Sequence, residues 1–237
     1  MANNLNFLLI LGSRFKNFFI KYKWFLLIFL VAAVLLKAFP QVDIYIRNIF
    51  FDSVSGFYMN DSPAAMTVYN AVNYVTMVIV SAYVILLAAD FFLKKNLFGI
   101  KRKTLVFLLV TLILGPGIIV NAVFKENVGR PRPEAIIEFG GTDTFVGPFT
   151  LSNACESNCS FPSGHAALGF YFMAFGLIAA KAMRKKLLTL GFIIGVIVSL
   201  TRIVQGRHFF SDTLFAFFFV FTISALVYEL MYDKDGE

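Results

Sequence analysis

Six long apolar segments dominate this chain and limit what it can fold into. About 20 apolar residues in a helix span the hydrocarbon core of a bilayer, and a segment inside lipid must satisfy its own backbone hydrogen bonds, as a helix does. The apolar segments cover residues 24–39, 68–92, 105–124, 164–180, 187–201 and 209–228. The sequence therefore predicts an all-α integral membrane bundle of six transmembrane helices.

The composition supports a membrane protein and argues against a nucleic-acid binder. Hydrophobic residues make up 59% of the 237 residues and charged residues only 15%, which leaves too little polar surface for a soluble domain of this size. The 30 phenylalanines suit helices that face lipid. The net charge of +7 lies in short basic runs beside the apolar segments, as topology determinants do, so we expect no nucleic-acid partner.

Those basic runs predict how the chain crosses the membrane. More than half of the lysines and arginines lie in residues 1–23, the turn 94–103 and the turn 181–186. We expect these segments to be cytoplasmic, and an even number of spans returns the C-terminus to the same side. The loops 125–162 and 202–208 then lie on the extracytoplasmic face.

The chain divides into three parts in this interpretation. Residues 1–23 form a cytoplasmic amphipathic N-terminal arm, residues 24–230 form the six-span domain, and residues 231–237 form a short acidic cytoplasmic tail. No cleavage pattern of small residues follows the first apolar segment, so we expect an uncleaved anchor. Within the linker that follows, residues 42–51 are expected to lie as an interfacial helix. The sequence Gly-Pro-Gly at 115–117 interrupts the third span, which is tolerated where neighbouring groups satisfy the freed backbone.

The first polar cluster on the expected outer face follows the third span. Lys125, Arg130 and Arg132 place three cations within eight residues. A basic anchor is ordinary on the cytoplasmic side, but cations on the opposite side indicate anion binding. Pro131 and Pro133 would hold Arg132 in an extended segment.

The second cluster opens the fourth span. Ser163 is expected near the helix N-cap, and the free N–H groups of Gly164 and His165 then form an anion site with the helix dipole. His165 can donate a proton to a leaving group. Taken alone, an ordinary serine cap beside a surface histidine is the simpler interpretation.

The third cluster opens the sixth span. Helical spacing of four would put His208 and Asp212 on one face, and a carboxylate that holds one imidazole nitrogen leaves the other free as a base or nucleophile. Arg202, just upstream, suits a negatively charged substrate. By itself the stretch is equally compatible with a basic rim at the membrane interface.

Together the clusters match the needs of phosphoryl transfer. Cations and a helix N-terminus can stabilise the charge on the phosphoryl oxygens, and a histidine can be held in line with the bond that breaks. No carboxylate cluster suited to Mg²⁺ lies near them in the sequence. We therefore expect metal-independent chemistry through histidine, without a cofactor.

The spacing of the three clusters resembles the signature of the type 2 phosphatidic acid phosphatase (PAP2) superfamily. The residues that carry the resemblance are Lys125-x6-Arg132-Pro133, then Pro162-Ser163-Gly164-His165, then Arg202-x5-His208-x3-Asp212. The six-span layout extends the likeness over about residues 20–230. One departure is Thr201, where the family usually has serine, and the hydroxyl is kept.

The resemblance implies a role for each matched residue. His208 would attack phosphorus and form a phosphohistidine, Asp212 would orient His208, and His165 would protonate the leaving oxygen and later activate water. The groups that would hold the phosphate oxygens are Lys125, Arg132, Arg202, the Ser163 hydroxyl and the Gly164 amide. Arg130 and Arg207 match no motif position, so they would serve either a second phosphate or head group, or ordinary interfacial contacts.

Two cysteines lie in the loop before the second cluster. Cys155 and Cys159 lack the second pair that a zinc site needs. In an oxidising compartment a disulfide is expected between them, with a modest effect on stability because the ring is small. Two free thiols without a role are the alternative.

The resemblance implies a phosphatase of the bacterial inner membrane whose active site faces the periplasm and whose substrate keeps its tails in the bilayer. The run Cys-x3-Cys-Ser-Phe-Pro-Ser-Gly-His looks most like enzymes that act on large envelope lipids, which favours lipid A. The alternatives are undecaprenyl pyrophosphate, phosphatidylglycerol phosphate, or transfer of the phosphate to a second lipid. Vanadium haloperoxidases share the motifs but are soluble, and a non-catalytic transporter should have lost one of the matched side chains. The sequence predicts no oligomeric state.

Overall fold

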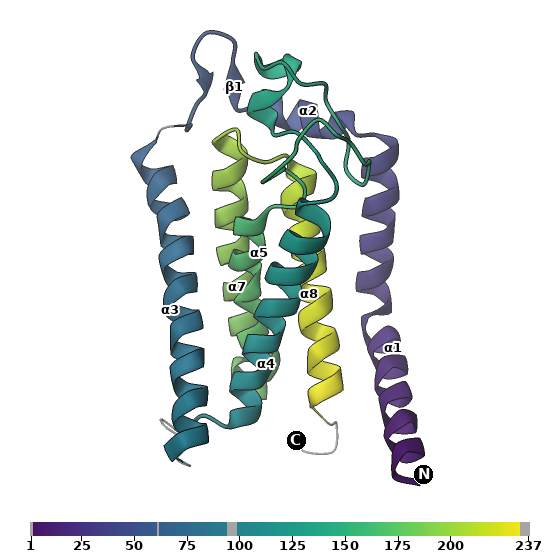
Figure 1. The fold of residues 1–237 in the computed structure, drawn as a ribbon. Helices are drawn as coiled ribbons and strands as arrows, with labels where there is room; N and C mark the ends of the chain where they lie inside the picture. Colours follow the sequence, from purple (N-terminus) through teal and green to yellow (C-terminus); the bar gives the residue numbers. More distant parts are fainter. Residues whose placement is uncertain (1, 61, 94–98, 233–237) are drawn as a thin grey trace.

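The protein is a bundle of long helices capped at one end by short elements (Figure 1). A computed structural model describes residues 2–60, 62–93 and 99–232. Within these ranges five helical segments are long and apolar enough to cross a membrane: Leu9–Ala38, Pro63–Leu93, Arg102–Lys125, Lys181–Val204 and Phe210–Met231. The predicted helical membrane bundle is therefore present.

The predicted fourth span is shorter than the others. It consists of helices α5 (Gly164–Tyr171) and α6 (Met173–Ile178), which together make an apolar segment of less than the usual crossing length. This segment lies against α7 (Lys181–Val204), where glycines let the backbones approach. A Cβ atom added at Gly191 would lie 2.5 Å from the Met173 nitrogen. The described part of the chain thus has five helices of crossing length and one shorter apolar segment, and the count of six spans stays a prediction.

Helix α1 (Ala2–Ala38) joins two segments that the sequence had separated. It runs without a break through residue 23, so the expected N-terminal arm and first span form one helix. Its aromatic rings pack on α8 (Phe210–Met231): Phe29 stacks on Phe218 with ring centroids 4.9 Å apart, and Phe25 meets Phe221 at the same distance. Burial of aromatic surface therefore holds α1 against the bundle.

The segment between α1 and α3 (Pro63–Leu93) crosses the capped end of the bundle. Helix α2 (Gln41–Asn48) lies where an interfacial helix was expected, and the hairpin of β1 (Phe51–Asp52) and β2 (Gly56–Phe57) follows it. The hairpin forms because the Asp52 carboxylate accepts hydrogen bonds from the N–H groups of Val54 and Ser55. This hairpin was not expected from the sequence.

The third span continues through its Gly-Pro-Gly sequence. Helix α4 (Arg102–Leu112) passes into the π-helix η2 (Ile113–Lys125). The side-chain amide of Asn121 donates to the Pro116 carbonyl over 2.7 Å, and Gly115 lies against the backbone of Val220 in α8. A side chain and a neighbouring helix thus support the irregular backbone, as such a break requires.

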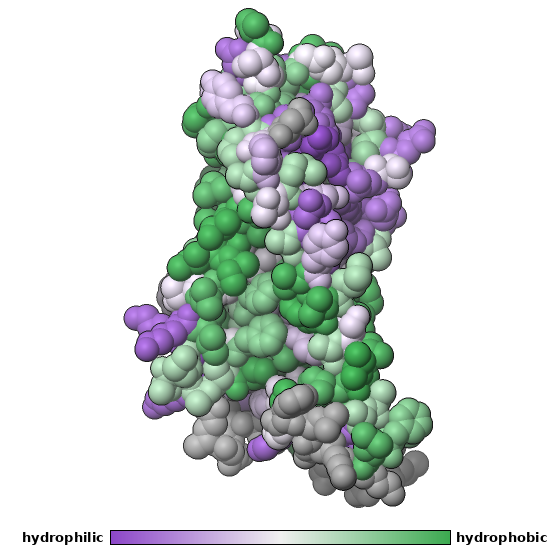
Figure 2. Space-filling view, turned by 90° about the vertical axis from the view of Figure 1, so that its left-hand side faces the viewer, coloured by the Kyte–Doolittle hydropathy of each residue, from purple (hydrophilic) through white to green (hydrophobic). Residues whose placement is uncertain are grey.

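The two ends of the bundle differ in character. The start of α1 and the end of α8 lie at the end opposite α2 and the hairpin (Figure 1), and Lys21 pairs with Glu229 there. Apolar side chains cover the middle of the α3 side, and hydrophilic ones gather toward the capped end (Figure 2). Lys94, Lys95 and residues 233–237, which the topology prediction used, lie outside the described residues. Which end faces the cytoplasm stays a prediction.

Candidate active site

The three polar clusters meet at the capped end of the bundle. The backbone N–H of Ser163 donates to the Asp212 carbonyl over 3.0 Å, and the N–H of Ser160 donates to the Arg130 carbonyl over 2.8 Å. Segments far apart in the sequence are therefore joined by backbone hydrogen bonds. The convergence expected from the topology is present in the structure.

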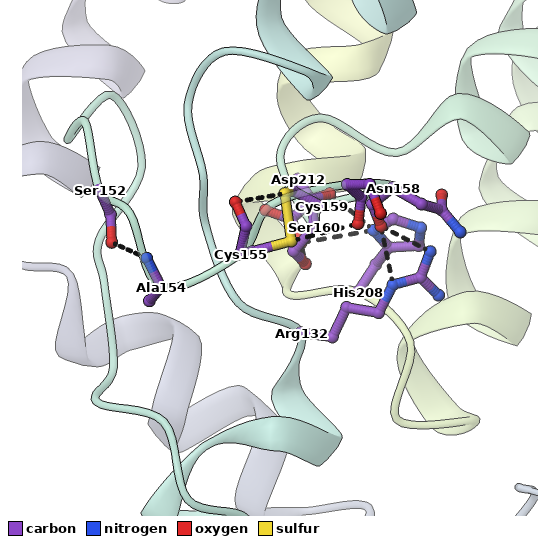
Figure 3. Close-up of a disulfide and its surroundings, with 10 residues drawn as sticks. Arg132, Ser152, Ala154, Cys155, Asn158, Cys159, Ser160, His208 and Asp212 are labelled. Atoms are coloured by element: carbon purple, nitrogen blue, oxygen red, sulfur yellow. Dashed lines mark hydrogen bonds and ion pairs between the residues drawn. A yellow bond between two sulfur atoms is a disulfide. The ribbon is translucent and has the colours of Figure 1, made fainter.

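His208 is held by a backbone carbonyl. Its Nδ1 lies 2.8 Å from the Ser160 carbonyl oxygen and 3.5 Å from Asp212 Oδ2 (Figure 3). A carbonyl can only accept, so Nδ1 carries the proton and Nε2 keeps its lone pair. Burial lowers the pKa of His208 to about 3, against the opposing influence of Asp212, which raises it. The imidazole is therefore neutral at physiological pH, as a nucleophile must be.

Asp212 reaches His208 by a different route from the one predicted. Helix α8 begins at Phe210, so His208 precedes the helix and the two side chains do not share a helical face. Instead Asp212 is the third residue of α8 and its Oδ2 accepts the Phe209 N–H over 2.7 Å, as an N-terminal cap does. The same oxygen accepts a hydrogen bond from the Ser160 hydroxyl. One carboxylate oxygen therefore holds both Phe209, which follows His208, and Ser160, whose carbonyl binds the imidazole.

His165 lies in the first turn of α5 beneath an aromatic ring. Tyr69 of α3 stacks on the His165 imidazole, with ring centroids 4.5 Å apart. The Arg202 guanidinium lies 5.0 Å from the centre of the Tyr69 ring. The buried Nε2 of His165 has no hydrogen-bond partner within the described residues. Ser163 is the N-cap of α5, as predicted, and accepts from Ala166 N. Tyr69 was missed because one tyrosine in an apolar helix gives no distinct sequence signal.

Two of the predicted phosphate-binding cations, Arg132 and Arg202, line one cavity. Its volume is about 240 Å³, and its lining residues are Met66, Tyr69, Arg132, Arg202, Gln205 and Arg207. Lys125 is buried at the end of η2. Burial lowers the pKa of Arg132, Glu134 opposes this, and the neighbouring Arg207 lowers the pKa further. This surplus of positive charge suits a phosphate.

Comparisons with known proteins identify the family. Residues 104–235 match the model of the PAP2 superfamily. The chain belongs to the PAP2 superfamily. A lipid A 4'-phosphatase of Francisella tularensis subsp. novicida is 38% identical over 83% of this chain and 89% of that protein. A lipid A 4'-phosphatase of Rhizobium etli is 30% identical over 74% of each chain.

Two further matches come from Bacillus subtilis. A phosphatidylglycerophosphatase B of Bacillus subtilis is 32% identical over 49% of this chain and 53% of that protein. The crystal structure of a transmembrane PAP2-type phosphatidylglycerolphosphate phosphatase from the same species superposes with a TM-score of 0.52, covering 85% of this chain and 91% of that one at 21% identity. That likeness shows a shared fold. With its family established, the present PAP2 protein is a membrane phosphatase, a phosphoric monoester hydrolase.

Arg130 and Arg207, which match no position of the PAP2 signature, have separate surroundings. Arg207 borders the cavity, with Nη1 2.5 Å from Glu134 and Nη2 3.2 Å from Asn60. Arg130 is fully buried and bound to carboxylates, so it contacts neither a head group nor the membrane interface. The interpretation of Arg130 as a residue for a second phosphate or an interfacial contact is therefore wrong.

Gly164 of the PAP2 signature has a structural reason to be glycine. A Cβ atom added there would lie 2.8 Å from Asn121 Oδ1. The missing side chain thus makes room for the amide that supports η2. The expected approach of a phosphate to the Gly164 amide stays a prediction.

The structure joins Cys155 and Cys159 in a disulfide next to the site (Figure 3). Within the ring, the Asn158 carbonyl accepts two hydrogen bonds from Arg132, over 3.0 and 3.2 Å. Ser160, which contacts both His208 and Asp212, follows the second cysteine directly. The disulfide therefore lies between an expected phosphate-binding arginine and the support of the expected nucleophile.

Proposed function

We propose that this PAP2 phosphatase removes the 4'-phosphate of lipid A at the periplasmic face of the bacterial inner membrane through a phosphohistidine. The main support is the environment of His208. Its imidazole is buried and neutral, and its Nδ1–H donates to the Ser160 carbonyl, which leaves Nε2 free as the nucleophile. The choice of lipid A rests on the two lipid A 4'-phosphatases that are 38% and 30% identical to this chain.

The reaction proceeds in two displacements. In the first, Nε2 of His208 bonds to phosphorus, the bond from phosphorus to the ester oxygen breaks, and His165 gives its proton to that oxygen. In the second, His165 takes a proton from water, the water oxygen bonds to phosphorus, and the phosphorus–nitrogen bond breaks to release inorganic phosphate. Asp212 stabilises the positive charge on the phosphorylated imidazole.

The phosphate oxygens are held by cations and by a helix N-terminus. Lys125, Arg132 and Arg202 supply positive charge around the cavity, and the Ser163 hydroxyl and Gly164 amide add hydrogen-bond donors at the start of α5. Charge is thus stabilised where it develops on the transferring group.

The disulfide supports the periplasmic placement. Disulfides persist in oxidising compartments such as the bacterial periplasm and are rare in the cytosol. The basic turns of the chain lie away from the Cys155–Cys159 loop in sequence and are expected on the cytoplasmic side. Both observations favour an active site that opens outward.

A substrate panel in detergent tests the choice of lipid. Lipid A is expected to lose phosphate faster than phosphatidylglycerol phosphate, undecaprenyl pyrophosphate and phosphatidic acid, with release of free phosphate in the absence of an acceptor lipid. Tandem mass spectrometry is expected to find the remaining phosphate at the other position of lipid A. Phosphate release from phosphatidylglycerol phosphate or undecaprenyl pyrophosphate alone would reassign the substrate, and product formation only with an acceptor lipid would indicate a phosphotransferase.

Chelation tests the proposed absence of a metal. Activity is expected to be unchanged in EDTA, because arginine and lysine side chains supply the positive charge and histidine supplies the nucleophile. The measurement is the initial rate of phosphate release before and after chelation, with Mg²⁺ restored to a matched sample. A rate that disappears in EDTA and returns with the metal would contradict the proposed route.

A further inference from the structure

Helix α2 places a buried carboxylate behind the proposed catalytic aspartate. Asp43 is 1% exposed, and its Oδ1 accepts the backbone N–H of Ser211 over 2.8 Å. Its Oδ2 accepts the Ser211 hydroxyl and, over 2.8 Å, the Nη2 of Arg130. A residue from the linker between the first two spans is therefore bonded to the residue next to Asp212.

Arg130 connects this carboxylate to Asp212. While Nη2 contacts Asp43, Nη1 lies 2.5 Å from Asp212 Oδ1 and 2.8 Å from the Ser211 hydroxyl. Its Nε donates to the Val146 carbonyl over 2.7 Å, and the guanidinium lies 4.2 Å from the centre of the Phe209 ring. All three nitrogens of a fully buried guanidinium are thus bonded, which fixes its position.

The bridge determines which oxygen of Asp212 faces the histidine. Because Arg130 occupies Oδ1, Oδ2 is left for Phe209 N, the Ser160 hydroxyl and the side of His208, whose Nδ1 lies 3.5 Å away. The carboxylate cannot rotate without breaking these bonds. Arg130 and Asp43, which binds it, therefore set the orientation of the carboxylate beside the imidazole.

Asp43 also balances the charge around Asp212. A second arginine, Arg47, lies one turn further along α2, fully buried and without a hydrogen-bond partner in the described part of the chain. Burial lowers the pKa of Arg47, and the charge of Asp212 opposes this. Without Asp43, Asp212 would be the one carboxylate left on Arg130 among the described residues. Such an excess of positive charge disfavours a positively charged imidazole nearby.

We propose that Asp43 and Arg130 are positioning residues for the phosphatase reaction, acting on His208 through Asp212. Neither residue lines the substrate cavity, and neither belongs to the three-part signature. The inference rests on the proposed role of His208 but not on lipid A as the substrate. Replacing the hydrogen-bond partners of metal-binding residues typically changes activity by about 10–100-fold, and we expect an effect of the same order from these indirect partners of His208.

The test is a kinetic double-mutant cycle. Asp43→Asn is expected to lower kcat by about 10–100-fold with little change in KM, because the substrate site is untouched. In an Asp212→Asn background the same change is expected to lower kcat much less, because its effect passes through Asp212. Asp52→Asn is the matched control, since Asp52 lies nine positions away in the hairpin and is expected to leave kcat unchanged.

The readouts separate a positioning role from a purely structural one. Phosphoenzyme formation is followed with 4-nitrophenyl phosphate as well as with lipid, so the result does not depend on the natural substrate. Should Asp43→Asn not fold, Arg130→Lys enters the same cycle, since lysine keeps the charge but cannot bond both carboxylates. An unchanged kcat, a change in KM alone, or additive losses with Asp212→Asn would overturn the inference. Activity in a His208→Ala control would instead overturn the proposed function.

Discussion

Replacing His208 with alanine is expected to lower kcat by about 10⁴-fold or more, as loss of a nucleophile does in other covalent catalysts. The side chain is buried, and its Nδ1 is bound by the Ser160 carbonyl, so no other imidazole can take its place. The measurement is phosphate release by purified protein in detergent, with size-exclusion chromatography to show that the variant remains folded. Turnover near the wild-type rate would disprove the nucleophile assignment.

A companion variant makes the covalent step visible. His165→Asn removes the proposed acid and base but leaves the nucleophile, so an ester with a good leaving group should still phosphorylate His208. Because no base then activates water, the acid-labile phosphoenzyme is expected to accumulate and to appear as a burst of one leaving group per protein. The His208→Ala variant provides the matched blank, and a burst in that blank would locate the phosphate on another residue.

Asp212→Asn is expected to lower kcat by about 10³–10⁴-fold, by analogy with a buried aspartate behind a catalytic histidine. The amide keeps the shape of the carboxylate but removes the negative charge that stabilises the phosphorylated imidazole. It also places an NH₂ group toward a donor, either Arg130 at Oδ1 or the Phe209 N–H and Ser160 hydroxyl at Oδ2. Initial rates and thermal unfolding in detergent measure the two effects separately.

The control for the Asp212→Asn prediction is an aspartate outside the site, Asp52. Asp52→Asn changes an aspartate that only caps the turn of the hairpin, and it is expected to retain activity. If Asp212→Asn retains activity equally well, then the Ser160 carbonyl alone suffices to prepare His208, and the charge of Asp212 has no part in the reaction.

Much of the fold could be predicted from the sequence because the bilayer imposes a length on apolar segments. The helices α3, α7 and α8 follow directly from apolar stretches bounded by polar residues. The three signature clusters were also found, since their residue types and spacing are unusual for membrane boundaries. Their meeting at one end then followed from the expected topology.

The support of the site could not be predicted, because nothing local distinguishes it. Asp43 and Arg47 stand four apart on a short amphipathic helix, a pattern typical of an exposed ion pair. In the structure both are buried, and Asp43 bonds to Arg130 instead. Likewise the contact of His208 with Asp212 was anticipated for the wrong reason, because the start of α8 depends on a cap that forms only when Asp212 folds back.

The shortness of the α5–α6 segment has a consequence for the lipid. At about 1.5 Å of rise per residue, the stretch Gly164–Ile178 reaches only some 22 Å, whereas the hydrocarbon layer is about 30 Å thick. In Figure 1, α5 starts well below the tops of α1 and α3. With the basic residues after α6 at one boundary, as the sequence predicts, we expect the N-terminus of α5 to lie several ångströms inside the opposite leaflet. A lipid head group would then have to move below its neighbours to react, and we expect faster turnover in thinner bilayers.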